Sequence, residues 1–148
     1  MTWFYQSQEI TELPEDIVGF VYLITTPEGK KYIGRKYFWS VRKAKGKTRR
    51  QRSESDWKTY YGSSEVLREQ IKSSDKSQFK REIISLHSTK GRVNYEEVRE
   101  QFANEVLERD DYINDNINGK WHRSPEHIRS KSKFSALASG RTSQQDSQ

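Results

Sequence analysis

The first clear pattern of apolar side chains in the sequence lies in residues 17–25, which are rich in β-branched and aromatic residues. This composition predicts a β-strand. Side chains on a strand point alternately to the two faces of a sheet, so Tyr22 shares its face with Phe20 and Ile24. The sequence therefore predicts a strand with three large side chains on one side.

A tight turn and a second strand follow. Residues 26–29 read Thr-Pro-Glu-Gly, and proline in the second place with glycine in the fourth is typical of a type I turn. Residues 31–38 are then expected to return as the second strand of a hairpin. Pairing about the centre of the turn places Tyr22 opposite or nearly opposite Tyr32.

Three more elements are expected in the middle of the chain. Residues 39–45 favour the start of a helix, which Gly46 would break. Residues 63–71 predict a short helix, because a serine at its start is a favoured N-cap. Residues 79–87 are again rich in β-branched residues and predict a third strand.

A longer helix is expected from Asn94 onward. Asn94 is a favoured N-cap, and Glu97 stands three residues later, where a glutamate can complete a capping box. The period of a helix then gathers four apolar or aromatic side chains on one stripe, namely Tyr95, Val98, Phe102 and Val106. We expect this stripe to pack on the sheet.

Together these elements predict an α+β fold, in which a small three-stranded antiparallel sheet is flanked by helices. We expect one domain over residues 1–122. Residues 123–148 are rich in serine, glutamine and lysine, and bury too little apolar surface to order themselves alone. A flexible polar tail is therefore expected there.

Composition narrows the class of protein. The chain has 148 residues, a formal net charge of +6 and no cysteine. Without cysteine there is no disulfide framework and no cysteine-ligated zinc or iron–sulfur site. No apolar run approaches the roughly 18 residues of a membrane span, and the N-terminus lacks the basic and apolar segments of a secretory signal. We therefore expect a cytoplasmic protein with no membrane partner.

The positive charge is concentrated in one region. Between Gly29 and Ser53 there are eleven Lys or Arg residues and no acidic residue, so the rest of the chain is net acidic. Such a block repels itself unless a polyanion meets it, which favours a surface for nucleic-acid phosphates over a solvated loop. The residues expected to contact nucleic acid are Arg35, Lys36, Lys43, Lys45, Lys47, Arg49, Arg50 and Arg52.

The two hairpin tyrosines belong to a longer motif. Val21-Tyr22 is followed, ten residues after Tyr22, by Tyr32-Ile33-Gly34. This arrangement resembles the signature of the GIY-YIG nucleases. The first half of the signature departs from the family pattern, because Phe20 and Val21 replace its glycine and isoleucine.

The resemblance continues downstream and covers about residues 17–120. Arg42 stands ten residues beyond Tyr32, where the family carries an arginine. Glu100 stands where the family places a metal-binding glutamate, and Asn114 where it places an asparagine. The ordered set is similar to phage-encoded members of the family, especially the Seg-like homing endonucleases.

Two of these assignments have alternatives. Glu96 lies on the same flank of the expected helix as Glu100, so periodicity does not choose between them, and the resemblance chooses Glu100. The family asparagine could be Asn114, Asn116 or Asn118.

The resemblance implies hydrolysis of phosphodiester bonds in DNA with one Mg²⁺ or Mn²⁺ ion held by Glu100. Arg42 would hold the phosphate, and Tyr22 or Tyr32 would orient or deprotonate the attacking water. A tyrosine has a pKa of about 10 in water, so it is a poor base unless a cation lowers that value. Tyr60 or Tyr61 would take the place of a further histidine or tyrosine found in some members.

We therefore expect a metal-dependent DNA endonuclease, free-standing or of the homing type, that needs no small-molecule cofactor. If it is phage-encoded, it would act in the cytoplasm of an infected bacterial host. The competing interpretation is a nucleic-acid-binding module that keeps the GIY-YIG fold without catalysis.

Overall fold

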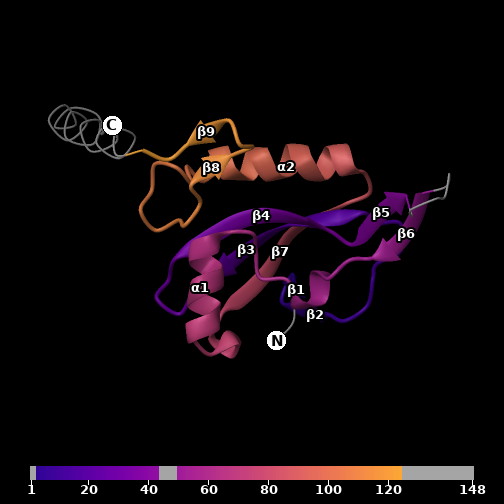
Figure 1. Cartoon of the computed structure of the whole chain (residues 1–148), viewed down its shortest axis with the longest axis horizontal. Coiled ribbons are helices and arrows are strands. Elements are labelled where there is room, and N and C mark those ends of the chain that lie inside the picture. The colour runs from indigo at the N-terminus through magenta and orange to yellow at the C-terminus, as the bar shows by residue number, and fades with distance from the viewer. Residues whose placement is uncertain (1–2, 44–49, 125–148) are drawn as a thin grey trace, which may run out of the picture.

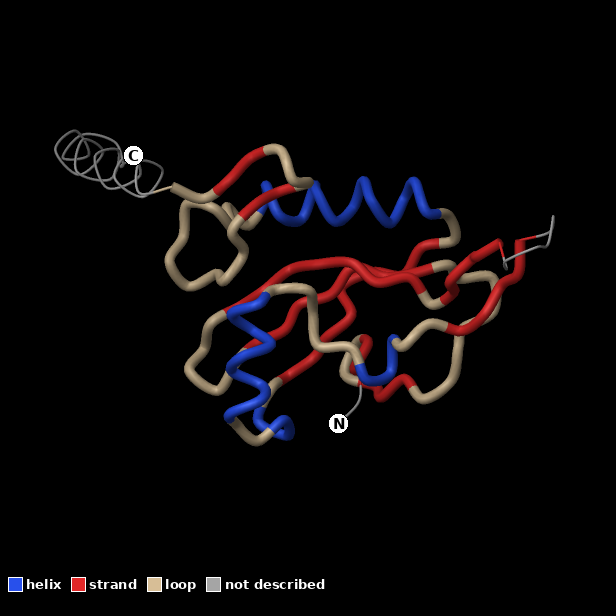
Figure 2. The backbone as a smooth tube through the Cα atoms, viewed as in Figure 1, coloured by secondary structure: helices blue, strands red, loops and turns tan. Residues whose placement is uncertain are grey.

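The structure, a computed structural model, describes residues 3–43 and 50–124, apart from the side chains of residues 41–43, 50 and 51. Its main element is a mixed five-stranded sheet with the strand order β2-β1-β7-β3-β4 (Figure 1 and Figure 2). β1 and β7 pair in parallel, and the other neighbours pair antiparallel. The strands are β1 (Trp3–Tyr5), β2 (Gln8–Ile10), β3 (Gly19–Thr25), β4 (Lys31–Tyr37) and β7 (Lys80–His87).

The prediction of a three-stranded antiparallel sheet is wrong in size. The three expected strands are present as β3, β4 and β7, and residues near the N-terminus add β1 and β2. Each added strand has three residues, too few for an alternating pattern to be recognised. A tertiary contact holds β1 in place, because the buried indole Nε1 of Trp3 donates a hydrogen bond to the carbonyl oxygen of Trp57, 2.7 Å away.

Two helices cover opposite faces of the sheet (Figure 1). They are α1 (Glu65–Ser73) and α2 (Lys90–Ala103), and the short 3₁₀ helices η1 (Trp57–Thr59) and η2 (Lys76–Gln78) flank α1. The alternation predicted for β3 is confirmed, since Tyr22 lies in the core on the α1 side and Val21 in the smaller core on the α2 side. Neither helix of the described ranges is long and apolar enough to cross a bilayer.

The serine cap predicted for α1 is confirmed. The Ser64 Oγ accepts a hydrogen bond from the backbone N–H of Leu67 at 3.3 Å. Leu67 and Ile71, one turn apart, are both buried against the sheet. A good cap and two apolar positions thus suffice to fix this short helix.

The β3–β4 hairpin forms as predicted, with a shifted register. The backbone N–H of Gly29 bonds to the carbonyl of Thr26 at 2.9 Å, which closes the expected turn. Lys30 belongs to the loop as well, so Tyr22 pairs with Gly34 and Tyr32 pairs with Ile24. The two tyrosines are therefore diagonal neighbours on one face, and their ring centroids are 6.2 Å apart.

The helix expected at residues 39–45 is wrong. β5 (Trp39–Lys43) pairs antiparallel with β6 (Arg50–Glu54), and this two-stranded ribbon projects from the end of the main sheet (Figure 1). Trp39 and Val41 alternate with Ser40 and Arg42, which is the period of a strand and not that of a helix. Arg42 thus lies on a strand opposite Gln51.

The start of α2 also differs from the prediction. Thr89, not Asn94, is the N-cap, and its Oγ1 accepts a hydrogen bond from the backbone N–H of Arg92 at 3.1 Å. The expected apolar stripe packs only in part, since Val98 and Val106 contribute to the smaller core while Tyr95 is 58% exposed and Phe102 is 49% exposed. The buried residues of α2 are Val93, Glu96, Glu97 and Gln101. The helix therefore presents polar side chains to the sheet.

The segment after α2 returns to β4. It contains a small hairpin of β8 (Asn116–Ile117) and β9 (Trp121–His122). The Arg123 guanidinium ties this segment together, because it donates to the carbonyls of Val106, Arg109, Tyr112 and Asn114. Residues 125–148, which contain most of the expected tail, lie outside the described residues.

Asn114 is the one of the three candidate asparagines that is buried against β4. Its Oδ1 accepts a hydrogen bond from the backbone N–H of Ile33 at 3.1 Å, and its Nδ2 donates to the Ile33 carbonyl at 2.8 Å. Asn116 instead bonds to Gly119 and Asp115 within its own hairpin. Asn114 therefore fastens the segment after α2 to the middle of β4.

Replacement of Asn114 by alanine should lower the free energy of unfolding by about 1–3 kcal/mol, since it leaves the buried N–H of Ile33 without a partner. Chemical denaturation measures the loss. Asn116→Ala is the control and should cost less than about 1 kcal/mol, because its hydrogen bonds are exposed. Equal losses for the two variants would contradict a special role for Asn114.

Candidate active site

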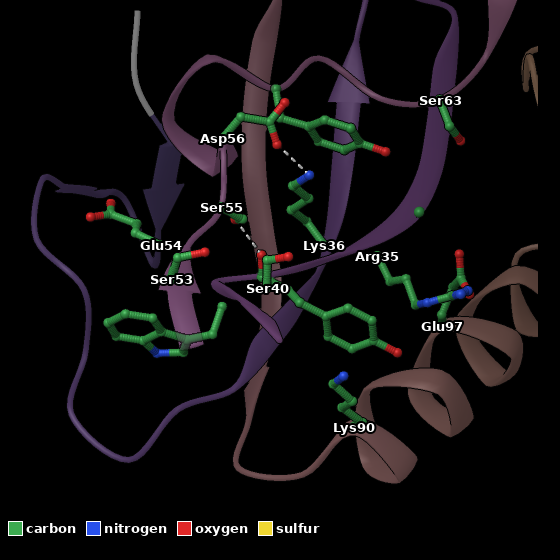
Figure 3. A pocket seen from close by; sticks show the side chains of 14 residues that line it. Arg35, Lys36, Ser40, Ser53, Glu54, Ser55, Asp56, Ser63, Lys90 and Glu97 are labelled. Carbon is green, nitrogen blue, oxygen red and sulfur yellow. Dashed lines mark hydrogen bonds and ion pairs between the residues drawn. The ribbon is translucent and has the colours of Figure 1, made fainter. Parts of the chain in front are cut away.

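An open cleft of about 890 Å³ lies between β4 and α2 (Figure 3). Its walls are formed by β4, the base of the β5–β6 ribbon, the connection over residues 53–63 and the first half of α2. Serine, tyrosine, lysine, arginine, aspartate and glutamate side chains line it. The cleft is therefore suited to a charged ligand that forms hydrogen bonds.

The hydroxyl of Tyr22 lies between two glycines behind this cleft. A Cβ atom on Gly34 would be 2.4 Å from the Tyr22 Oη, and one on Gly62 would be 3.5 Å from it. Gly62 also has a φ of +93°, a conformation that side chains other than glycine rarely adopt. The absence of a side chain at Gly34 leaves the space that the Tyr22 hydroxyl occupies, while glycine at position 62 allows the positive φ.

Three tyrosines meet at this point. The Tyr22 ring lies 6.2 Å from that of Tyr32 and 6.0 Å from that of Tyr60, measured between centroids. The Tyr32 hydroxyl is 2.9 Å from the Ser63 Oγ. Burial raises the pKa of Tyr22 well above its ordinary value, and burial also raises the pKa of Tyr32. Both hydroxyls are therefore protonated at neutral pH and can donate hydrogen bonds.

A buried arginine positions Tyr60. The Arg81 Nη1 donates a hydrogen bond to the carbonyl of Tyr60 at 2.7 Å. The guanidinium lies 4.1 Å from the ring centroid of Tyr61 and 4.7 Å from that of Trp3. Of the two tyrosines left open by the sequence, Tyr60 lines the cleft, while Tyr61 packs against Arg81.

An ion pair joins the two walls of the cleft. The Arg35 Nη1 on β4 lies 2.7 Å from the Glu97 Oε1 on α2, and the two side chains point toward each other in Figure 3. The Glu97 side chain is 12% exposed and that of Arg35 is 40% exposed. This difference in exposure explains the directions in which the two pKa values shift. At Glu97, burial raises the pKa and outweighs the attraction of Arg35. At the more exposed Arg35, burial lowers the pKa, but the contact with Glu97 outweighs it, so the pKa is raised.

Gln101 completes the polar face of α2. Its Nε2 donates to the Ile33 carbonyl at 3.0 Å and approaches the Glu97 Oε2 at 3.4 Å. Its Oε1 is buried without a hydrogen-bond partner among the described residues. An unsatisfied buried acceptor beside a carboxylate would be stabilised by a hydrogen-bond donor.

The donor set can be tested against a divalent cation. The described residues contain no group of three or more His, Cys, Asp or Glu side chains that could hold a metal. Mg²⁺ does not require such a group, because it keeps several waters and commonly binds through one or two carboxylates plus substrate phosphates. Glu97, with one oxygen turned away from Arg35, fits that mode.

The structure brings some predicted site residues together and not others. Neither Tyr22 nor Tyr32 lines the cleft, but the Tyr32 hydroxyl bonds to Ser63 in its wall and Tyr22 lies behind Gly34. Asn114 supports β4 through the backbone of Ile33. Glu100 does not line the cleft, and its carboxylate contacts Asn104 and Arg99 of the same helix. The side chain of Arg42 lies outside the described residues, so its approach to a phosphate stays a prediction.

Only some of the residues expected to contact nucleic acid can be placed in the structure. Two of them line the cleft and a third lies on β6, namely Arg35, Lys36 and Arg52. Lys43 and Arg50 pair at the end of the described ribbon, and their side chains are not described. Lys45, Lys47 and Arg49 lie outside the described residues.

The sequence did not identify Glu97 as a site residue, because the predicted helix start placed it in the first turn. With Asn94 taken as N-cap, Glu97 becomes a capping residue at the helix start. With Thr89 as N-cap, Glu97 lies in the second turn, above Val93 and below Gln101 on the buried face. The spacing 93, 97, 101 was the available signal, a helical stripe that changes from apolar to polar.

Comparison with known proteins identifies the family of the chain. The family model described as "Putative endonuclease segE, GIY-YIG domain" matches residues 3–117. The chain belongs to the GIY-YIG endonuclease family. Searches of curated proteins and of solved structures found no match.

The matched range and the two half-motifs of this GIY-YIG domain can be located on the strands of the sheet. The matched range begins at Trp3 and therefore includes β1 and β2, the strands that sequence patterns missed. The glycine of Tyr32-Ile33-Gly34 provides space for the Tyr22 hydroxyl of the other half-motif. The two halves of the GIY-YIG signature thus contact each other directly across β3 and β4.

Gly34→Ala should destabilise this GIY-YIG domain by about 1–3 kcal/mol, because the added methyl group overlaps the Tyr22 hydroxyl. Adding Tyr22→Phe should restore part of the loss by removing that oxygen. Thermal and denaturant unfolding of the two single variants and the double variant measure the coupling. Gly91→Ala on α2 is the control and should be neutral or stabilising, since no atom lies within 4 Å of an added Cβ there.

Stability should depend on pH in opposite directions at two adjacent glutamates. The pKa of Glu97 is raised in the fold, so ionising Glu97 lowers the stability of the wild-type protein as the pH rises above the ordinary pKa of 4.5. Glu97→Gln avoids this penalty. The variant should therefore be more stable than wild type at pH 7–8 and lose that advantage toward pH 4.5. Hydrogen bonding to Arg99 lowers the pKa of Glu96, so Glu96→Gln should be less stable at pH 7–8, and its deficit should shrink in acid.

Denaturant unfolding from about pH 4 to pH 8 tests both variants under the same conditions. A Glu97→Gln variant that is less stable than wild type at pH 8 would mean that attraction to Arg35 exceeds the burial penalty.

Proposed function

We propose that this GIY-YIG chain hydrolyses phosphodiester bonds of DNA in the cleft between β4 and α2, with the help of Mg²⁺ or Mn²⁺. The observation that carries the proposal is the buried Glu97 carboxylate, which faces Arg35 near the three clustered tyrosines. A carboxylate, a guanidinium and hydroxyl donors are the groups that binding a cation and a phosphate diester requires.

Glu97 is the residue that we propose to hold the cation. When bound, the cation supplies neutralisation of the negative charge that builds up on the phosphate and the leaving oxygen. Glu97 suits this task because burial holds its side chain in one orientation while its second oxygen is turned away from Arg35. Glu100 remains the candidate chosen by the sequence resemblance, and because its carboxylate contacts Asn104 and Arg99 instead of Arg35, it is the natural comparison.

Arg35 is proposed to bind the phosphate. Its guanidinium presents several N–H donors in a fork that matches two phosphate oxygens, and it keeps its charge at every working pH. Before substrate binds, Glu97 occupies one of these donors. A phosphate and a cation that arrive together would each take one member of the ion pair, so that neither charge is left unpaired in the cleft. Arg42 is proposed as a second phosphate contact, by the family resemblance.

The tyrosines are proposed to orient water and phosphate rather than to remove protons. Burial keeps the Tyr22 and Tyr32 hydroxyls protonated. The partly exposed Tyr32 hydroxyl can donate one hydrogen bond to a phosphate oxygen and accept one from the attacking water, whereas the fully buried Tyr22 hydroxyl would act by holding Gly34 and Tyr32 in place. Tyr60 lines the cleft beside Lys36, whose ammonium lies 4.0 Å from its ring centroid.

The biological setting that we propose rests on the resemblance to Seg-like enzymes. It is that of a phage-encoded, free-standing or homing-type nuclease acting in the cytoplasm of an infected bacterium. The excess of positive charge between Gly29 and Ser53 supports DNA as its partner.

Cleavage assays on Glu97→Gln and Glu100→Gln test the metal ligand. We expect Glu97→Gln to lower the cleavage rate at least about 10²-fold with supercoiled plasmid and Mg²⁺, because an amide is a weak ligand for a hard cation. Glu100→Gln should stay within about threefold of wild type, because the Glu100 carboxylate does not line the cleft. EDTA should abolish cleavage by every variant.

The reverse order of activities would restore Glu100 as the ligand. Wild-type protein that binds plasmid but never cuts it, with or without Mg²⁺, would favour the non-catalytic interpretation.

A further inference from the structure

A second hollow lies beside the cleft at the start of α2. It has a volume of about 510 Å³ and is bounded by residues 16–18, Ser88 and Arg52. Trp39 and Lys90 line both this hollow and the cleft. The two depressions therefore adjoin at these side chains, with Glu97 in the first and Arg52 in the second, and together they are called the groove.

Two cations of this groove are held by aromatic rings instead of by carboxylates. The Arg52 guanidinium lies 3.9 Å from the ring centroid of Trp39, and the Lys90 ammonium lies 5.2 Å from that of Tyr37. Figure 3 shows Lys90 projecting from the start of α2 into the cleft. Neither cation forms an ion pair with a residue in the described part of the chain.

The other cations of the cleft are bound differently. Arg35 is paired with Glu97 at 2.7 Å, and Lys36 is paired with Asp56 at 2.6 Å. An ion pair neutralises a cation and occupies its donors, whereas a ring fixes the position of a cation and leaves its charge and its N–H groups available. Among the described residues, Arg52 and Lys90 are thus held in position by rings and are not tied up in ion pairs, a state that favours capture of an anion.

The position of Lys90 adds to this effect. It is the first residue of α2, and the N-terminus of a helix carries partial positive charge. Within the described residues, Asp16 is the carboxylate that lines the second hollow and opposes an anion there. Two cations against one carboxylate still leave this part of the groove positive.

We propose that this groove binds the DNA backbone next to the scissile phosphate, and that Lys90 and Arg52 each contact a flanking phosphate. The proposal rests on the proposed nuclease function and adds the path of the strand, from the Glu97 end of the cleft past Trp39 to Arg52. Trp39 and Tyr37 act as supports that hold the two cations toward the groove.

Equilibrium binding in EDTA tests the path without interference from cleavage. The probe is a fluorescein-labelled DNA duplex, and the dissociation constant is measured by anisotropy between about 50 and 200 mM salt, a range over which counterion release dominates. Arg52→Ala/Lys90→Ala should make the plot of log affinity against log salt shallower by about 1.8, since each lost phosphate contact removes about 0.9.

Three further variants serve as controls. Lys72→Ala/Lys76→Ala removes the same charge from α1 and η2 and should leave the slope unchanged. Arg52→Lys/Lys90→Arg keeps both cations and should restore most of the wild-type slope. Asp16→Asn removes the opposing carboxylate at a residue with a φ of +59°, which asparagine tolerates, and should raise affinity.

The outcomes separate this proposal from the function on which it rests. An Arg52→Ala/Lys90→Ala slope equal to that of wild type, in a protein that cuts DNA, would overturn the groove and leave the nuclease intact. A drop in slope equal to that of Lys72→Ala/Lys76→Ala would also overturn it, since the loss would reflect net charge alone. Wild-type protein that neither binds nor cuts DNA would overturn both.

Discussion

A carboxylate buried between a helix and a sheet needs either a proton or a cation, and the packing of α2 on β4 depends on how Glu97 meets that need. Arg35 supplies the cation across the interface, and Gln101 joins Glu97 to the backbone of Ile33. The helix can therefore bury a polar face, while its aromatic residues Tyr95 and Phe102 stay exposed. An apolar helix face would hold the sheet more simply, but it would leave no charged cleft between them.

The elements that sequence reasoning identified are those whose determinants are local. The β3–β4 hairpin has a proline–glycine turn and an alternating strand, and α1 has a serine cap, so each can be read within about ten residues. β1 could not be read in this way, because its three residues depend on the distant contact of Trp3 with Trp57. The strand at residues 39–43 was taken for a helix although its alternation has the period of a strand, so that error lies in the reading and not in the information available.

At the site, the spacing of the motif was enough to name Tyr22 and Tyr32 as candidates, because both belong to one hairpin. The motif left Asn114, Asn116 and Asn118 open, and only the burial of Asn114 against Ile33 distinguishes it from the other two. Glu97 and Arg35 come together from different elements, and a helix start that was misplaced by five residues turned Glu97 into a cap. The raised pKa of Tyr22 could not be anticipated either, since it follows from the burial of its side chain beneath the loop at Gly62.

The amide of Asn114 has a consequence for association as well as for stability. β4 is the last strand of its sheet, and an exposed edge strand invites pairing with another chain. Asn114 gives Ile33 the same donor and acceptor that a residue of a neighbouring strand would give, and the backbone of Ile113 and Asp111 does likewise for Lys31. The Asn114 side chain satisfies the backbone N–H and C=O of Ile33 alone. A sixth strand would also pair with Gly34 and Arg35 and would cover the cleft. The domain thus blocks edge-to-edge aggregation over part of β4 and leaves the remainder accessible to a ligand.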